Sequence, residues 1–305
     1  MVTREPARYT GRFAPSPTGP LHFGSLVAAV ASYLQARSRG GKWLLRIEDI
    51  DPPREQPGAS EAIIAALALC GFEWDGPVLY QSQSHDAHHR ALRQLVADGH
   101  AYRCDCSRAN LADLPRGPLG PIYPGTCRAG CDADEAAVRV RTCDDPLAFE
   151  DAVQGRYCQR LESESGDFVI CRRDGLIAYH LAVVVDDALQ GITEVVRGMD
   201  LLDSTPRQIW LQRLLGYPTP GYAHIPLVLG RDGTKLSKSL GAGAADIAHP
   251  ARAVVAALKA LNQSPPAELE RASLAETWAW ATAHWQCQAL VGVTSIAAPE
   301  VPDSP

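Results

Sequence analysis

The fold is decided by the stretch Arg12-Phe-Ala-Pro-Ser16-Pro-Thr-Gly19-Pro-Leu-His22-Phe-Gly24. It joins a predicted strand at residues 9–14 to a predicted helix at residues 24–39. In a parallel α/β sheet, ligands bind at this junction, where the helix N-terminus offers free N–H groups to phosphate. Gly19 and Gly24 let the backbone approach a ligand, and His22 can donate a hydrogen bond to a phosphate oxygen. The plain alternative is a Pro/Gly turn with an exposed histidine.

Composition and charge narrow the class of protein. The 305 residues are 46% hydrophobic and 21% charged, as in an average soluble protein. No run reaches the roughly 18–20 apolar residues of a membrane span, and the polar start lacks a signal region, so we expect a cytoplasmic protein with no membrane partner. With 29 Lys and Arg against 35 Asp and Glu, the chain is too acidic for a general nucleic-acid coat. A local basic strip could still contact RNA.

Strand-like and helix-like stretches alternate along the first hundred residues. After the opening motif come predicted strands at 43–47 and 78–81 and predicted helices at 58–70 and 84–98. Alternation at this pitch indicates βαβ units and a parallel sheet, so we predict an α/β fold.

The remainder of the chain departs from this alternation and then resumes it. Residues 101–164, with clustered cysteines and a Pro/Gly-rich loop, read as an insertion. The apolar run at 181–185 predicts a buried parallel strand. A helix is predicted at 251–261, and the Pro-rich end from residue 297 is expected to be disordered.

A second candidate phosphate site is Lys235-Leu-Ser-Lys238-Ser239, which follows a strand-like stretch at 225–229. Two lysines three residues apart can surround a phosphate chain whose charge shifts during transfer. The motif alone is weak, because surface loops often contain lysine. Paired with the first motif in this order, it is strong.

The cysteines suggest a metal site. There are nine, and without a secretion signal they indicate thiols or metal ligands rather than disulfides. From spacing alone, the natural zinc-binding set is Cys104, Cys106, Cys127 and Cys131. The alternative is a group of free buried thiols without metal.

The two motifs together resemble a known family. His22-Phe-Gly24-Ser25 resembles the HIGH signature of class I aminoacyl-tRNA synthetases, and the lysine motif resembles KMSKS. Longer blocks resemble the glutamyl branch: Arg46-Ile-Glu48-Asp49-Ile-Asp51, Ala178-Tyr179-His-Leu-Ala182 through Asp186-Asp187, and Val196-Arg197-Gly198-Met-Asp200 through Pro206-Arg207-Gln208. The match is closest to its short paralogues, the glutamyl-Q tRNA(Asp) synthetases. That family activates glutamate and transfers it to the queuosine base in the anticodon of tRNA(Asp).

The resemblance implies a Rossmann-like, doubly wound catalytic core with a zinc-bearing insertion and a short helical C-terminal region. We expect a domain order of core (1–100), insertion (101–165), core (166–240), helical region (241–296) and disordered tail (297–305).

The resemblance also implies an L-glutamate pocket. Glutamate has one ammonium group and two carboxylates, so Arg12 and Arg197 suit carboxylate recognition and Glu48 suits the ammonium. Tyr179 could supply a hydroxyl and a flat wall, and Ser16 completes the set. The bland alternative is that Glu48 and Arg197 pair on the surface.

Catalysis, in this family, is adenylation of the glutamate α-carboxylate by ATP. We expect His22 and Lys238 to stabilise charge on the phosphates, with Lys235 in support. His22, Gly24 and Lys238 form the predicted ATP site, and Mg²⁺ would accompany the ATP. The family pattern replaces Cys131 as zinc ligand by a tyrosine, here Tyr123, giving Cys104, Cys106, Tyr123 and Cys127.

The acceptor is predicted from two departures from full-length glutamyl enzymes. The chain after residue 239 is too short for a separate anticodon-binding domain, and Leu201 stands where those enzymes have histidine. Both favour queuosine-bearing tRNA(Asp), with Arg207 and Arg213 expected to contact RNA phosphates. The alternatives are a minimal synthetase that charges tRNA(Glu), and a catalytically silent, zinc-bearing RNA-binding paralogue.

Overall fold

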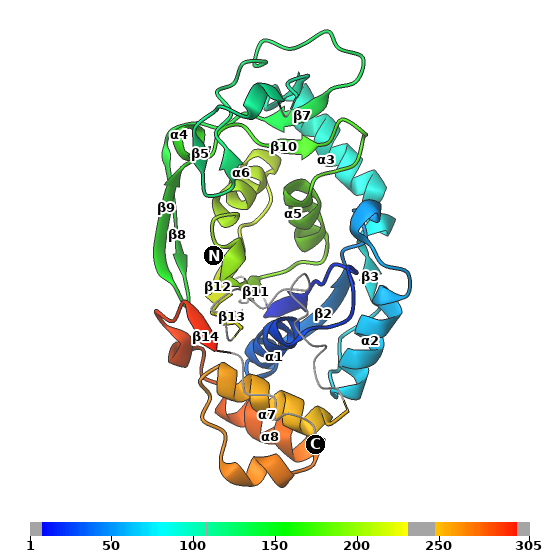
Figure 1. Cartoon of the computed structure of the whole chain (residues 1–305), viewed down its shortest axis with the longest axis vertical. Helices are drawn as coiled ribbons and strands as arrows, with labels where there is room; N and C mark the ends of the chain where they lie inside the picture. The colour runs from blue at the N-terminus through cyan, green and yellow to red at the C-terminus, as the bar shows by residue number, and fades with distance from the viewer. Residues whose placement is uncertain (1–7, 108, 231–247, 298–305) are drawn as a thin grey trace, which may run out of the picture.

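The computed structural model describes residues 8–107, 109–230 and 248–297. The predicted lysine motif, with Lys235 and Lys238, lies outside the described residues, as does the end of the chain from residue 298. Figure 1 shows parallel strands in the middle of the molecule. Strands β7 (Ala137–Val140) and β10 (Val169–Cys171) lie toward one end, and helices α7 (Pro250–Ala260) and α8 (Leu274–His284) lie at the other.

The central strands form two sheets in which most neighbouring strands are parallel. One sheet has the order β1-β2-β3, with β1 (Thr10–Phe13), β2 (Lys42–Ile47) and β3 (Leu79–Tyr80). A second has the order β11-β12-β8-β9, with β11 (Glu194–Gly198), β12 (Gly221–Ile225), β8 (Pro146–Asp151) and β9 (Gly155–Arg160). The β8–β9 pair is antiparallel, whereas β11–β12 and β12–β8 are parallel.

A pair of threonines connects the two sheets. The Thr193 N–H donates to the Thr10 carbonyl at 2.9 Å, and the Thr10 N–H donates to Thr193 Oγ1 at 2.9 Å. This brings β11, from the second half of the chain, next to β1, from the first half. In such sheets, ligands bind at the carboxyl ends of neighbouring strands whose following connections run in opposite directions. The boundary between β1 and β11 is therefore the expected place for a site.

The helices of the first half follow the sequence prediction. They are α1 (Phe23–Arg37), α2 (Ala59–Leu69) and α3 (His85–Ala97). The predicted strands at 9–14, 43–47 and 78–81 and the predicted C-terminal helix are also confirmed, the last as α7 (Pro250–Ala260). Helix α8 (Leu274–His284) begins with a capping box formed by Ser273 and Glu276. Within the described residues, no helix combines the length and apolar character needed to cross a bilayer.

The strand predicted at 181–185 is wrong. These residues lie in helix α5 (Tyr179–Leu189), which packs against α3, β10 (Val169–Cys171) and α6 (Thr205–Leu215). All five side chains of the run are buried. An apolar run that is buried on every side fits a core helix as well as a core strand, so periodicity could not separate the two.

The predicted insertion begins with a small antiparallel sheet of order β10-β7-β4, where β4 is Ala101–Cys104 and β7 is Ala137–Val140. Two strands of two residues each, β5 (Arg116–Gly117) and β6 (Gly120–Pro121), form a hairpin in the cysteine-bearing segment. Helix α4 (Leu161–Glu164) lies at the end of the predicted insertion. Strand β13 (Leu227–Leu229) pairs in parallel with β14 (Ser295–Ala297), so the end of the described chain returns to the core.

An aromatic cluster joins the sheet to α8. Trp43 is fully buried and stacks on Phe72, with ring centroids 5.4 Å apart, while Tyr33 meets Trp43 edge-on at 5.1 Å. Trp278 of α8 packs against Tyr33 and Phe72 at 4.8 and 5.0 Å. Gly71 has a φ of +76°, and a Cβ there would lie 2.9 Å from a Leu274 methyl, so this turn requires glycine.

Replacing Trp43 by alanine should lower the free energy of unfolding by about 3–5 kcal/mol, because it leaves a cavity that the surrounding rings cannot fill. Urea unfolding followed by circular dichroism measures the change. Leu69→Ala is the control: Leu69 is 57% exposed, and its loss should change the free energy by less than about 0.5 kcal/mol. Equal effects of the two substitutions would contradict a core centred on Trp43.

Candidate active site and metal-binding cluster

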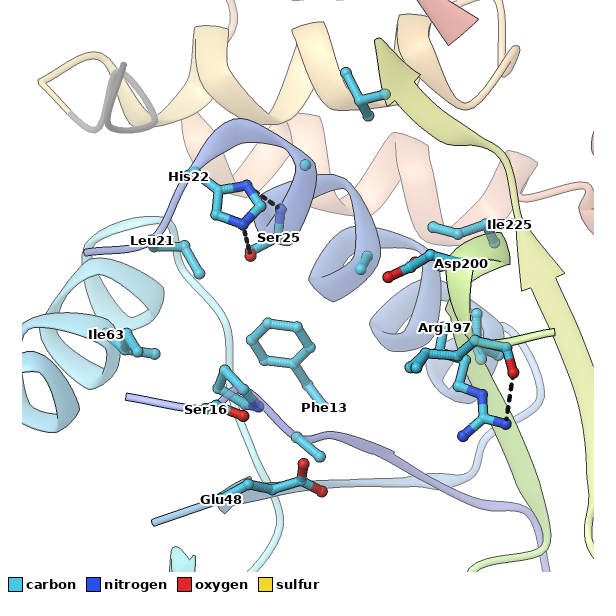
Figure 2. A pocket seen from close by; sticks show the side chains of 18 of the residues that line it. Phe13, Ser16, Leu21, His22, Ser25, Glu48, Ile63, Arg197, Asp200 and Ile225 are labelled. Carbon is cyan, nitrogen blue, oxygen red and sulfur yellow. Dashed lines mark hydrogen bonds between the residues drawn. The ribbon is translucent and has the colours of Figure 1, made fainter. Parts of the chain in front are cut away.

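One cavity of about 320 Å³ lies at the junction of β1, α1 and β11. It brings together every predicted site residue of the catalytic core that lies in the described chain: Arg12, Ser16, His22, Gly24, Glu48, Tyr179 and Arg197. Figure 2 shows His22 and Ser25 at the start of α1 on one side of the cavity, and Arg197 and Glu48 on others. A second cavity of about 260 Å³ adjoins it and shares Ser16, Thr18, Glu48 and Tyr179.

His22 is the N-cap of α1. Its Nδ1 accepts a hydrogen bond from the Ser25 N–H at 3.2 Å, which satisfies one of the free donors at the helix start. A neutral ring that accepts at Nδ1 carries its proton on Nε2, which lies 2.9 Å from Ser25 Oγ. The exposed-turn alternative is therefore wrong, because His22 caps α1, is partly buried and lines the cavity.

A buried charge network lies beneath the cavity. Asp187 of α5 accepts from Arg12 Nε at 3.2 Å and from Arg46 Nη1 at 2.8 Å. Arg46 in turn donates through Nη2 to Glu48 Oε1 at 3.2 Å. All four residues are at most 8% exposed. Glu48 thus pairs with Arg46 in the interior, so the alternative of a surface pair between Glu48 and Arg197 is wrong.

The pKa values of the two carboxylates in this network are shifted in opposite directions. Burial alone would raise the pKa of Asp187, but the charges of Arg12 and Arg46 outweigh it and lower that pKa. At Glu48 burial dominates over the same two arginines and raises the pKa. Burial also raises the pKa of Tyr179, which keeps its phenol protonated. The two arginines therefore stabilise the anionic form of Asp187 more than that of Glu48.

Arg197 leaves one buried donor unused. Its Nη2 donates to Thr205 Oγ1 at 2.8 Å and to the Leu201 carbonyl at 3.3 Å, a bond drawn in Figure 2. Its Nε donates to His224 at 3.0 Å. Nη1 is buried and has no partner within the described part of the chain. Leaving such a donor unsatisfied costs about 1–3 kcal/mol, so an acceptor on a ligand is the natural partner.

Sequence reasoning missed two members of the site, Arg46 and Asp187. Arg46 and Glu48 are two residues apart at the end of β2 and so project to the same face. The sequence signal for this pair was the presence of two opposite charges on one face of a strand that is otherwise largely apolar. Asp187 is the second residue after the apolar run 181–185, for which the sequence predicts a strand, and its contacts depend on how the chain folds.

The predicted metal ligands form a cluster. The sulfur atoms of Cys104, Cys106 and Cys127 lie within 4.8 Å of one another. Tyr123 Oη is 3.4 Å from the Cys104 sulfur and 3.5 Å from the Cys106 sulfur. Cys131, the rival ligand, does not belong to this group among the described residues.

The surroundings favour the thiolate form of Cys104, whereas burial raises the pKa of Cys127. Arg139 Nε donates to the Cys104 sulfur at 3.2 Å, and its guanidinium lies 4.0 Å from the centre of the Tyr123 ring. Burial raises the pKa of Cys104, but hydrogen bonds from Tyr123 and Arg139 give a net lowering. Three soft, closely spaced ligands beside a cation can hold a metal ion.

One predicted RNA contact is wrong. Arg207 is buried in α6, where its Nε donates to Ser165 Oγ at 2.7 Å and its guanidinium lies over the Phe168 ring. Burial lowers its pKa to about 10. Arg207 therefore cannot reach a phosphate at the surface, whereas Arg213 on the same helix is exposed.

Comparison with known families agrees with this geometry. Residues 9–249 match the family described as "tRNA synthetases class I (E and Q), catalytic domain". The chain belongs to this family of class I synthetases and is a ligase-type enzyme.

Curated relatives narrow the group. The chain is 52% identical over 297 residues to the "Glutamyl-Q tRNA(Asp) synthetase" of Pseudomonas fluorescens, covering 97% of this chain and 98% of the relative. It is 54% identical over 287 residues to the protein of the same name from Dechloromonas aromatica, covering 92% and 95%. A crystal structure of a glutamate tRNA ligase from Elizabethkingia meningosepticum, in complex with its amino acid, superposes with a TM-score of 0.79 at 25% identity. That match covers 96% of this chain and 67% of the ligase.

Replacing Asp187 by asparagine should lower the free energy of unfolding by about 3–5 kcal/mol at neutral pH, because two buried arginines lose their shared anion. The pKa of Asp187 is lowered in the folded state, so its stabilisation is present above the unfolded pKa near 4 and is lost as the pH falls through the folded pKa. The gap between wild type and D187N should therefore narrow in acid.

Urea unfolding at a series of pH values measures this gap. The control is Asp144→Asn, which removes a surface pair with Arg160 whose side chains are about half exposed. Its effect on the free energy of unfolding should be far smaller than that of D187N at neutral pH, because a solvent-exposed ion pair contributes little to stability. A D187N deficit that is small at neutral pH, or that widens in acid, would show that Asp187 does not hold the network as an anion.

Proposed function

We propose that the protein activates L-glutamate with ATP in the absence of tRNA and transfers it to the queuosine base at the wobble position of tRNA(Asp). The observation that carries the proposal is the single cavity in which a helix N-terminus meets two buried arginines and a buried glutamate. The names of the relatives, which match over nearly their whole length, supply the identity of the acceptor. A cytoplasmic location is proposed because tRNA and ATP are found there.

The charges of the cavity suit glutamate. Arg197 would offer its Nη1–H, which has no partner among the described residues, to one carboxylate, and Arg12 of the neighbouring strand β1 would receive the other. Glu48 would accept the ammonium group, with Ser16 and Tyr179 completing the walls. A bound ammonium would also keep Glu48 ionised against the effect of burial on its pKa.

Adenylation requires alignment and charge stabilisation rather than a covalent nucleophile. The α-carboxylate attacks the α-phosphorus of ATP, a new O–P bond forms, and pyrophosphate leaves. His22 and Gly24, at the start of α1, would contact the phosphates. Lys235 and Lys238 are proposed to reach the same phosphates together with Mg²⁺, although their motif lies outside the described residues.

Transfer would use a hydroxyl of the queuosine cyclopentene diol. This hydroxyl attacks the activated carbonyl carbon, loses its proton as the ester forms, and releases AMP. The second cavity, which shares Ser16, Glu48 and Tyr179 with the first, leaves room for an acceptor beside the activated carboxyl group. The structural likeness to a glutamate tRNA ligase keeps charging of tRNA(Glu) as the second candidate.

With ATP and labelled glutamate, we expect label on tRNA(Asp) from cells that make queuosine and none on tRNA(Asp) from cells that cannot. The two preparations differ only in the base, so each controls the other, and tRNA(Glu) tests the second candidate. Oxidising the queuosine diol while the terminal ribose is protected should abolish labelling. Equal labelling of both preparations, or labelling of tRNA(Glu) alone, would mean that the acceptor is elsewhere.

We further propose that the cluster binds one zinc ion through Cys104, Cys106, Cys127 and Tyr123, and that this ion stabilises the insertion. Cys127→Ser should lose the metal, as measured by elemental analysis, and should lower the melting temperature. Cys131→Ser, the matched control in the same segment, should keep one zinc per chain. Loss of zinc in C131S with full loading in Tyr123→Phe would instead establish the four-cysteine set, and zinc-free wild type would refute the site.

A further inference from the structure

We propose that His224 is a positioning residue for Arg197, and that Asp151 holds it in the one tautomer that can do this. The inference rests on the proposed function, because it concerns how Arg197 is aimed at a glutamate carboxylate. His224 does not line the cavity, and it acts only through the arginine.

The sheet register places the two side chains together. Arg197 in β11 and His224 in β12 are direct partners in a parallel pair. Arg197 Nε lies 3.0 Å from His224 Nε2, and His224 is completely buried. The contact is therefore fixed by backbone pairing rather than by a flexible loop.

The direction of this hydrogen bond determines the tautomer. An arginine Nε can only donate, so His224 Nε2 must accept and the imidazole proton must be on Nδ1. Nδ1 lies 2.6 Å from Asp151 Oδ2, which accepts that proton's hydrogen bond. Thr205 Oγ1 lies 3.1 Å from His224 Nε2 and accepts a hydrogen bond from Arg197 Nη2. Thr205 and His224 therefore contact the same side of the guanidinium.

Asp151 is itself rigidly held. Its Oδ1 accepts from the backbone N–H groups of His224, Val153 and Gln154 at 3.0, 3.0 and 2.9 Å. Burial would raise the pKa of Asp151, but its bonds to His224 and the backbone produce a net lowering, which keeps it an anion. Burial lowers the pKa of His224 despite Asp151, so the ring is a neutral acceptor.

The consequence is a fixed guanidinium plane. With Nε held by His224 and Nη2 by Thr205 and Leu201, rotation of the planar group is blocked. Nη1 is then the one guanidinium nitrogen with no hydrogen-bond partner among the described residues. Without His224, Arg197 would keep its charge but lose its orientation, and a displacement of about 1 Å in a positioning group can cost on the order of 10²-fold in rate.

The test is glutamate-dependent exchange of pyrophosphate into ATP by the full chain. His224→Phe keeps the ring but removes both nitrogens, and should raise the glutamate KM about 10- to 100-fold with a much smaller change in the ATP KM. His224→Gln, whose amide oxygen can replace Nε2 as acceptor, should recover most of the loss. In an Arg197→Lys background, which has no Nε–H, His224→Phe should add little.

The matched control is His88→Phe. His88 is also completely buried and also bonded to an aspartate, Asp186, at 2.9 Å, but it contacts neither Arg197 nor either cavity. It should lower the melting temperature and leave the ratio of glutamate to ATP KM unchanged.

If His224→Phe does not fold, Asp151→Asn carries the same test, because an amide can donate to Nδ1 and so favour the wrong tautomer.

The outcomes separate the two proposals. No glutamate-dependent exchange by the wild type would refute the proposed function. Active wild type with a normal glutamate KM in His224→Phe, or with parallel increases in both KM values, would refute the positioning role alone. An additive effect of His224→Phe in the Arg197→Lys background would show that the histidine does not act through the arginine.

Discussion

The carboxylate of Asp187 connects the two halves of the catalytic core. It accepts from Arg12 at the end of β1 and from Arg46 at the end of β2, while its own helix, α5, belongs to the second half of the chain. A buried carboxylate is tolerated only when it is paired and hydrogen-bonded, so these contacts constrain where α5 can pack. The position of Glu48, through Arg46, and that of Tyr179, at the start of α5, both follow from this constraint.

The arrangement of the buried charges around the cavity suits an amino acid with a second carboxylate. Arg12 and Arg197 both line the cavity, and Glu48 is the acidic side chain beside them. Each arginine is linked to a buried aspartate, Arg12 directly to Asp187 and Arg197 through His224 to Asp151. The two carboxylates of the proposed substrate would meet the two arginines, and its ammonium would meet the carboxylate whose pKa burial raises.

The features that depend on residues close together in the sequence could be predicted from the sequence. The turn after β1, the His22 cap and the first three helices follow from glycine, proline and periodic apolar residues near in sequence. The convergence of Arg12, Glu48 and Arg197 could be expected only from family resemblance, because they lie on different strands. The helix at 181–185 and the burial of Arg207 depend on neighbours from distant segments, and Cys131 was separated from the metal cluster only by geometry.

The two arginines proposed to bind the substrate carboxylates are held in different ways, and this bears on the proposed activation of glutamate without tRNA. Arg12 is paired with Asp187, whereas Arg197 is held entirely by neutral groups, namely His224, Thr205 and a carbonyl. A guanidinium surrounded by neutral acceptors keeps its positive charge available, and Nη1 makes no hydrogen bond to any residue that the structure describes. A carboxylate of the proposed substrate would supply an acceptor for this donor, whose burial without one costs about 1–3 kcal/mol. Because the holding groups belong to β12, to α6 and to the helical turn Met199–Leu201 that follows β11, all the contacts that orient Arg197 come from the folded chain itself.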